Sequence, residues 1–175
     1  TVTDNSNCTE TYTVTITQPA ALNVSSSHTN VSCFGGSNGS ISLTVTGGTP
    51  GYSYNWTGPA SPCPNSPNLT NLTAGIYDVT VTDDNNCTVS TSINITQPSE
   101  ALSVSESHTN VSCFGDNNGS ISLTVTGGTP GYNYNWTGPS CPCPDSPNLT
   151  NLSGGFYNVT VTDALTNIAD CKLEW

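Results

Sequence analysis

The residues of this chain that could do chemistry are eight cysteines, twelve carboxylates and two histidines. His28 and His108 have no cysteine or carboxylate at a ligand spacing around them, which favours a surface or hinge role for both. Cys141 and Cys143 form one closely spaced pair of thiols, with no second pair to complete the four ligands of a structural zinc site. These residues therefore predict no resident metal centre.

Carboxylates and amides gather in two stretches, Asp83 to Asn86 and Asp116 to Asn118. Oxygen ligands of this kind suit Ca²⁺, but Asp and Asn are also the residues that most often form turns. Calcium therefore stays open as an alternative, and we expect no cofactor. The chain contains neither a Ser, His and Asp set in a hydrolase context nor a glycine loop that reads as a phosphate site, so we expect no enzyme.

The charge is strongly one-sided: Lys172 is the single basic residue, and the formal net charge is −11. Nucleic acids are bound by neutralising their phosphates with Lys and Arg, and anionic membrane surfaces attract basic segments, so neither is an expected partner. No apolar run approaches the ~18 residues of a membrane span, so we expect no membrane insertion. Eight cysteines in an Asn, Ser, Thr and Gly-rich chain are typical of an oxidising, extracellular setting.

The chain repeats itself with a period of 80 residues. Residues 28–83 return at 108–163, and only ten of the 56 aligned positions differ. A period of this kind means that each unit is one module with copies of itself as neighbours. Near-identical copies are typical of spacers, stalks and multivalent binders rather than of enzymes.

Apolar or aromatic residues alternate with Ser, Thr, Asn or Asp over short stretches such as 41–46, 52–56 and 77–82. This period of two residues predicts strands with one buried face. Turns rich in Gly, Pro, Asn and Asp separate the strands, and no helical period is present. The pattern predicts an all-β chain folded as β-sandwiches.

Residues 1–19 align without gaps on residues 80–98, the closing section of the module. We therefore predict that 1–19 is the closing strand of a preceding or neighbouring module. Residues 20–98 are a complete module, and residues 99–175 are a second module without its last strand. The sequence after Asp163 departs from the repeat, and Cys171 lies four residues later than the period predicts.

The order of motifs resembles a known repeat. Cys33-Phe-Gly-Gly is followed by GSISLTVTGGTPGYSYNW, then by NLTNLTAGIYDVTVTDDNNC and TVSTSINITQP. This order is similar to the SprB-type repeat of large surface adhesins in gliding Bacteroidetes. The resemblance implies tandem immunoglobulin-like β-sandwiches, secretion to the cell surface and a part in adhesion, motility or extracellular matrix. Two features depart from the common pattern: the Pro-rich loop, which holds Cys63 in the first module and Cys141 and Cys143 in the second, and the missing final strand of the second module.

An immunoglobulin-like topology also implies roles for single residues. It places the start of the first strand and the turn between the last two strands at one end, which predicts a Cys33–Cys87 disulfide and, by the period, Cys113–Cys171. A bridge closing a loop of that length contributes about 3–4 kcal/mol. Cys8, Cys63, Cys141 and Cys143 stay unassigned. Tyr77 is similar to the corner tyrosine of such folds.

Fifteen Asn-X-Ser/Thr sequons are the strongest modification signal. They suggest a glycoprotein, although an Asn and Thr-rich strand surface also creates sequons freely. The candidates are Asn7, Asn23, Asn30, Asn38, Asn55, Asn68, Asn71, Asn86, Asn94, Asn110, Asn118, Asn135, Asn148, Asn151 and Asn158.

Together these features predict a structural subunit or segment of an extracellular fibre or surface stalk, whose partners are adjacent repeats or copies of itself. The alternative is an adhesin module that binds a glycan or another surface. Tyr12, Val14 and Ile16 have the spacing of Thr91, Ile93 and Ile95. They could donate a strand to the open module of the next subunit, in head-to-tail assembly. The alternative is a slice of a longer array, because any slice taken out of phase has complementary ends.

Overall fold

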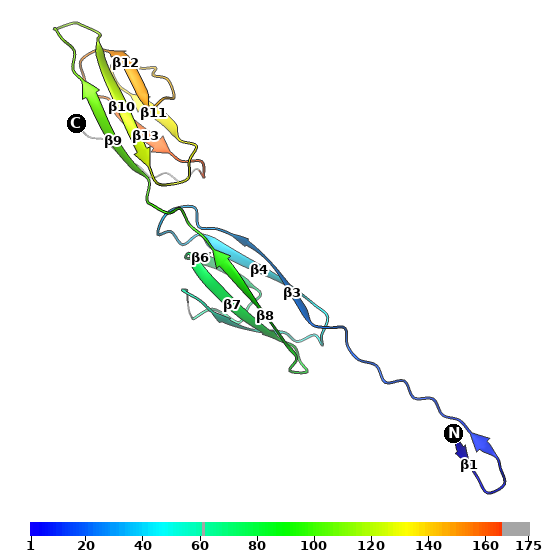
Figure 1. Cartoon of the computed structure of the whole chain (residues 1–175). Helices are drawn as coiled ribbons and strands as arrows, with labels where there is room; N and C mark the ends of the chain where they lie inside the picture. The colour runs from blue at the N-terminus through cyan, green and yellow to red at the C-terminus, as the bar shows by residue number, and fades with distance from the viewer. Residues whose placement is uncertain (61, 166–175) are drawn as a thin grey trace.

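A computed structural model describes residues 1–60 and 62–165. Every regular element in these two ranges is a β-strand, as the alternating pattern predicts. Figure 1 shows two strand-rich modules following one another along an elongated molecule, with an extended segment leading into the first. The all-β prediction is confirmed, whereas the division at residues 19 and 98 stays a prediction. We call residues 20–98 the first module and residues 99–165 the second module.

The first module is built from two antiparallel three-stranded sheets. One has the order β3-β4-β6 and the other β5-β7-β8. The strands are β3 (Asn23–Thr29), β4 (Gly39–Thr46), β5 (Ser53–Thr57), β6 (Asn68–Leu72), β7 (Gly75–Thr82) and β8 (Thr88–Ile95). Buried side chains from both sheets form a single core, so the module is a β-sandwich compatible with the immunoglobulin-like arrangement.

The inward rows that the sequence predicts are the rows that are buried. Tyr77, Val79 and Val81 on β7 are at most 1% exposed, because alternate residues of a strand face the same side. On β5, Trp56 is buried and its indole N–H donates a 2.9 Å hydrogen bond to the carbonyl of Ser66. That bond ties the Pro-rich loop to the core and satisfies the polar atom of the indole ring.

The second module repeats this plan with one strand fewer in the described range. Its sheets have the orders β9-β10-β12 and β11-β13. The strands are β9 (Ser103–Thr109), β10 (Gly119–Thr126), β11 (Asn133–Thr137), β12 (Asn148–Leu152) and β13 (Asn158–Thr162). Up to residue 165, no strand pairs with the edge of β13 that corresponds to the edge of β7 covered by β8.

The segment before the first module is only partly a strand. β1 (Val2–Thr3) pairs with β2 (Thr9–Glu10) in a small hairpin. Its turn repeats the β7–β8 turn, since the Asp4 carboxylate accepts the amides of Ser6 and Cys8, as Asp83 accepts those of Asn85 and Cys87. Residues 11–22 then run without strand pairing, so the predicted strand has no partner strand among residues 1–60 and 62–165.

The predicted Cys33–Cys87 disulfide is wrong, because both residues are free thiols at opposite ends of the first module. The amide of Val31 donates to the carbonyl of Thr96, which places the Cys33 segment beside the last residues of β8. Cys87 precedes the first residue of β8, and a strand of eight residues spans about 26 Å at ~3.3 Å per residue. A disulfide needs Cα atoms within ~7 Å.

The second predicted disulfide, Cys113–Cys171, was inferred from the first by the period of the repeat. Cys113 is a free, exposed thiol, and its predicted partner, Cys171, lies outside the described residues. Among the described residues a disulfide joins Cys141 to Cys143, with 4.3 Å between their Cα atoms. It closes a loop of three residues, whereas the predicted bridges would have linked distant strands.

Candidate functional site

A groove of about 350 Å³ lies at the far end of the second module. The end of β9, the start of β10 and the segment after β12 form its walls. Its lining is mostly apolar. The lining includes His108, Asn110, Val111, Gly119, Ile121, Leu152, Gly154, Phe156 and Tyr157.

The first module shows what fills the equivalent space. Ile95, the last residue of β8, is 1% exposed and lies against Gly39, where an added Cβ would come within 3.0 Å of the isoleucine Cγ2. Along β7, eight residue pairs from Gly75↔Ile95 to Thr82↔Thr88 hold β8 in place. The closing strand therefore supplies both the apolar contact and the hydrogen-bonded edge at this end.

Polar contacts continue beyond β8. The amide of Thr96 donates to the side-chain oxygen of Asn30 at 3.0 Å, and its carbonyl accepts the amide of Val31 at 2.9 Å. The side-chain oxygen of Gln97 accepts the amide of Gly35 at 3.0 Å. We call the contacts of Thr96 and Gln97 with Asn30, Val31 and Gly35 the Thr-Gln latch.

In the second module the equivalents of the latch residues are Asn110, Val111 and Gly115. None of the corresponding bonds forms between them and residues 1–60 or 62–165. Val31 is 2% exposed and fully covered, whereas Val111 is only partly buried. The groove is thus the closing-strand position without a closing strand among the described residues.

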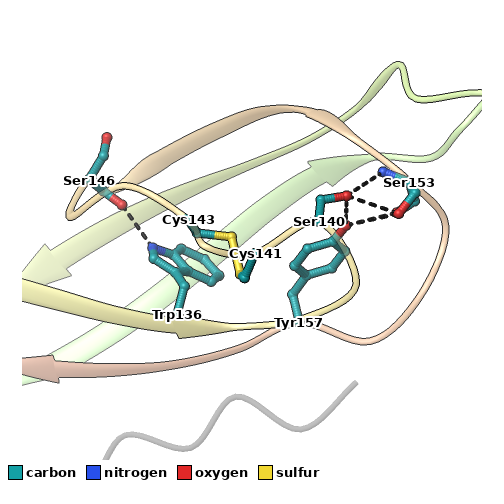
Figure 2. Close-up of a disulfide and its surroundings, with 7 residues drawn as sticks. All are labelled: Trp136, Ser140, Cys141, Cys143, Ser146, Ser153 and Tyr157. Atoms are coloured by element: carbon teal, nitrogen blue, oxygen red, sulfur yellow. Dashed lines mark hydrogen bonds between the residues drawn. A yellow bond between two sulfur atoms is a disulfide. The ribbon is translucent and has the colours of Figure 1, made fainter.

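One wall of the groove is fastened by a contact that the first module lacks. The hydroxyl of Tyr157 donates to the hydroxyl of Ser140 at 2.8 Å, and the amide of Ser153 donates to the same oxygen at 3.1 Å (Figure 2). Position 60, the counterpart of Ser140, is alanine. Nothing in the sequence pattern pointed to Ser140; the only signal was that it is one of the ten differing positions.

The tyrosine corner is confirmed in both modules. The hydroxyl of Tyr77 donates to the carbonyl of Thr73 at 3.1 Å, and that of Tyr157 contacts the carbonyl of Ser153 at the same distance. Such a bond to the backbone a few residues upstream is the mark of the immunoglobulin-like corner.

The Cys141–Cys143 disulfide directly follows Ser140 and packs against the core of the second module (Figure 2). In the first module serine stands at position 61, so Cys63 has no partner at this spacing. The Cys63 thiol contacts the carbonyl of Ala60 at 3.6 Å instead. The extra cysteine at position 141 therefore stiffens the loop that carries Ser140.

The acidic turn at the other end of the first module uses its oxygens internally. Asp83 is buried, and its carboxylate accepts amide hydrogen bonds from Thr49, Asn85 and Cys87 at 2.8–3.0 Å. The Thr49 amide, followed by those of Cys87 and Asn85, lowers the pKa of Asp83, although desolvation opposes the shift. These contacts favour the turn interpretation of this stretch over a calcium site.

His108 lies beside a carboxylate. Its Nδ1 is 3.0 Å from a carboxylate oxygen of Glu106, a contact that was not predicted from the sequence. Residues i and i+2 of a strand share a face, so the spacing itself was the available signal. In the described residues no group of three or more His, Cys, Asp or Glu side chains could hold a metal ion.

The sequon asparagines fall into two kinds. Asn55 on β5, Asn94 on β8 and Asn158 on β13 are exposed, as predicted for outward strand positions. The amide groups of Asn38 and Asn118 instead donate to the hydroxyls of Ser32 and Ser112 within their turns. Glycosylation at any of the fifteen sites stays a prediction.

The fold and the repeated sandwich define a tandem β-sandwich repeat protein. Residues 25–61 and 105–140, one stretch in each module, match the family model of the SprB repeat, which confirms the predicted resemblance to a SprB-type repeat. No curated protein matches the chain. SprB repeats occur in cell-surface proteins. The described part of the chain contains no helix long and apolar enough to cross a membrane.

Proposed function

We propose that this chain is a structural segment of an extracellular fibre or surface stalk, and that it acts without catalysis, a cofactor or nucleic acid. The near-identity of the two modules supports this role, because a spacer needs only to repeat one stable unit. The surface location of SprB repeats is consistent with it.

The connection between the modules suits a stalk. Gln97 is fixed to the first module by Gly35, and the carbonyl of Glu100 accepts the amide of Gly128 of the second module at 3.0 Å. Only two residues, Pro98 and Ser99, separate these anchors. So short a link, half of it proline, restricts the bending between neighbours.

We further propose that copies join head to tail by strand donation. The observation that supports this proposal is that the same four residues, Ile-Thr-Gln-Pro, occur in two environments. At 95–98 they are part of the first module, and at 16–19 they have no strand partner in the described part of the chain. Tyr12, Val14 and Ile16 are 85%, 69% and 93% exposed, respectively. An apolar strand without a partner and a groove of matching shape are a donor and an acceptor. Because they are different surfaces of one chain, the contact propagates as a filament.

Deletion of residues 1–19 tests this function. We expect the shortened chain to remain monomeric in light scattering and to form no filaments in electron micrographs, whereas the full chain assembles. A matched control removes only residues 1–8, which include β1 and leave the donor segment; it should assemble like the full chain. Assembly of the 1–19 deletion at the wild-type level would contradict strand donation.

A ligand-binding module is the second candidate. The loop that carries the Cys141–Cys143 disulfide differs between the modules at residues 140, 141 and 145, and a varied loop is where a binder would place its specificity. A glycan array probed with the double substitution Cys141→Ser and Cys143→Ser beside the wild type would reveal this activity. Binding that the substitution abolishes would favour the adhesin role.

A further inference from the structure

The groove offers more than an apolar surface, because Asn110 and Val111, which stand at two of the three latch positions, line it. In the first module Asn30, Val31 and Gly35 bind the two residues that follow the closing strand. Their counterparts are Asn110, Val111 and Gly115, whose neighbours in sequence are nearly the same. An incoming strand that ends in Thr-Gln would therefore meet the same donors and acceptors.

We infer that the groove selects a strand ending in Ile-Thr-Gln, supplied by residues 16–18 of a second copy. Ile16 would lie over Gly119, Thr17 would bond to Asn110 and Val111, and Gln18 would bond to the amide of Gly115. This inference rests on strand donation and adds to it the residues that fix the register of the donated strand.

Gly119 provides the space for the isoleucine. An added Cβ there would come within 3.0 Å of the carbonyl of Leu152 and 3.4 Å of the Val111 Cγ1 atom. Gly39 plays the same part beneath Ile95 in the first module. Glycine at both positions lets a large aliphatic side chain of the closing strand approach the backbone of the opposite sheet.

The pairing of β7 with β8 gives the expected register. Transferred by the repeat, Gly75↔Ile95 becomes Gly155↔Ile16, and Thr80↔Ser90 becomes Thr160↔Thr11. Thr9 and Glu10 are already paired with β1, so the donated ladder runs over six residues, 11–16. In this register Tyr12, Val14 and Ile16 all face the core.

Some of the differences between the modules lie at the groove. Three of the ten differing positions, Ser153, Gly154 and Phe156, line it, and a fourth, Ser140, is hydrogen-bonded to its wall. One end of two otherwise equal modules thus meets different neighbours: its own chain in the first and, by this inference, a separate chain in the second.

Electrostatics do not oppose the contact. Residues 11–19 carry no charged side chain, although the whole chain has a net charge of −11. A donor segment with carboxylates would be repelled by a second acidic chain, while an uncharged one can enter an apolar groove without losing hydration of a charge.

The test uses the full chain with Ile16→Asp, which disables the donor while leaving the groove intact. Ile16 is exposed, so the substitution does not disturb folding. A labelled peptide of residues 11–19 should bind this variant in fluorescence anisotropy, and the Ile16→Asp peptide should not bind. A Gln18→Ala peptide should bind up to about tenfold more weakly, the effect of one lost hydrogen bond.

A matched pair of protein variants tests whether the peptide contacts Asn110 of the second module. Asn110→Ala, added to the Ile16→Asp chain, should weaken peptide binding by a similar factor. Asn30→Ala in the same background should leave binding unchanged, because that asparagine is bonded to Thr96 of its own chain.

The outcomes separate the two proposals. If the wild-type and Gln18→Ala peptides bound with equal affinity and Asn110→Ala did not change that affinity, the role of the latch would be contradicted. Strand donation would not be affected by this result. If the Ile16→Asp chain still polymerised, strand donation itself would fall. If that chain were monomeric but bound no peptide, the groove would not be the acceptor and the inference would be overturned.

Discussion

The two modules share almost every residue, yet corresponding strands differ in length. β7, which contains the corner tyrosine of the first module, has eight residues, whereas β13, which follows the corner tyrosine of the second, has five. β7 starts at Gly75, directly opposite the last residue of β8, whereas β13 starts only at Asn158. A strand edge forms regular structure where a neighbour satisfies its backbone groups. The closing strand therefore orders the end of the module.

The effect of the closing strand on burial is confined to one end of the module. Val159 and Val161 of the second module are 3% and 0% exposed, nearly as buried as their counterparts in the first. Packing of the two sheets buries this core although the β11-β13 sheet has no third strand among the described residues. The exposed fraction of the phenylalanine in the turn between the first two strands changes far more, from 51% at Phe34 to 109% at Phe114. The comparison thus separates a core that forms in both modules from an end that the closing strand β8 completes in the first.

The largest effect expected is from Ile95→Ala, which would make the first module resemble the second. Loss of a fully buried isoleucine should lower the free energy of unfolding of the first module by about 2–4 kcal/mol. Urea denaturation measures it, and Ile76→Ala is the control, because Ile76 is 60% exposed and should change stability by less than ~0.5 kcal/mol. Equal effects from both substitutions would contradict the role given to β8.

Reduction of the Cys141–Cys143 disulfide should have a smaller effect, confined to the second module. A loop closed over a sequence separation of 2 removes little chain entropy, so we expect a loss of about 1.5 kcal/mol. This replaces the ~3–4 kcal/mol expected of a long-range bridge. Thermal melts with and without reductant test it, and a collapse of both modules would show that another disulfide stabilises them.

Tyr157→Phe should cost about 1 kcal/mol, and more than Tyr77→Phe, since Tyr157 also bonds to Ser140. Ser140→Ala, which installs the residue of the first module, should make the two tyrosine substitutions equivalent. A double-mutant cycle by urea denaturation measures the coupling. Its absence would mean that the Ser140 contact does not stabilise the groove wall.

The smallest effect expected is the pH dependence from Asp83. The pKa of this carboxyl is lowered in the folded state from 3.8, so its ionised form stabilises the first module above that pH. The contribution is lost as the pH falls below about 3.8. Melts between pH 5 and about pH 2 for the wild type and Asp83→Asn test it, and the variant should show the shallower decline. Parallel curves would contradict the prediction.

Of the candidate site, the sequence predicted the proposed donor segment and the open second module, but not the residues that line the groove. Aligning residues 1–19 on 80–98 identified Tyr12, Val14 and Ile16 as strand-like without any coordinates. The groove could not be read in this way, because its walls come from three stretches that meet only in the folded sandwich. Ser140 and the latch contacts were missed for the same reason: their partners lie 13 to 66 residues away.

The sequence by itself determined the repeat, the strands and the faces that they bury, because alternation is a local property of the backbone. Tyr77, Val79 and Val81 are inward wherever β7 lies. Tertiary structure alone decided which ends meet. Cys33 lies beside the last residues of β8 and Cys87 beside its first, so two thiols that a topological analogy paired are kept apart by the length of one strand. Which cysteines meet in a sandwich depends on the order and direction of the strands. The alternation of residues along a single strand predicts neither.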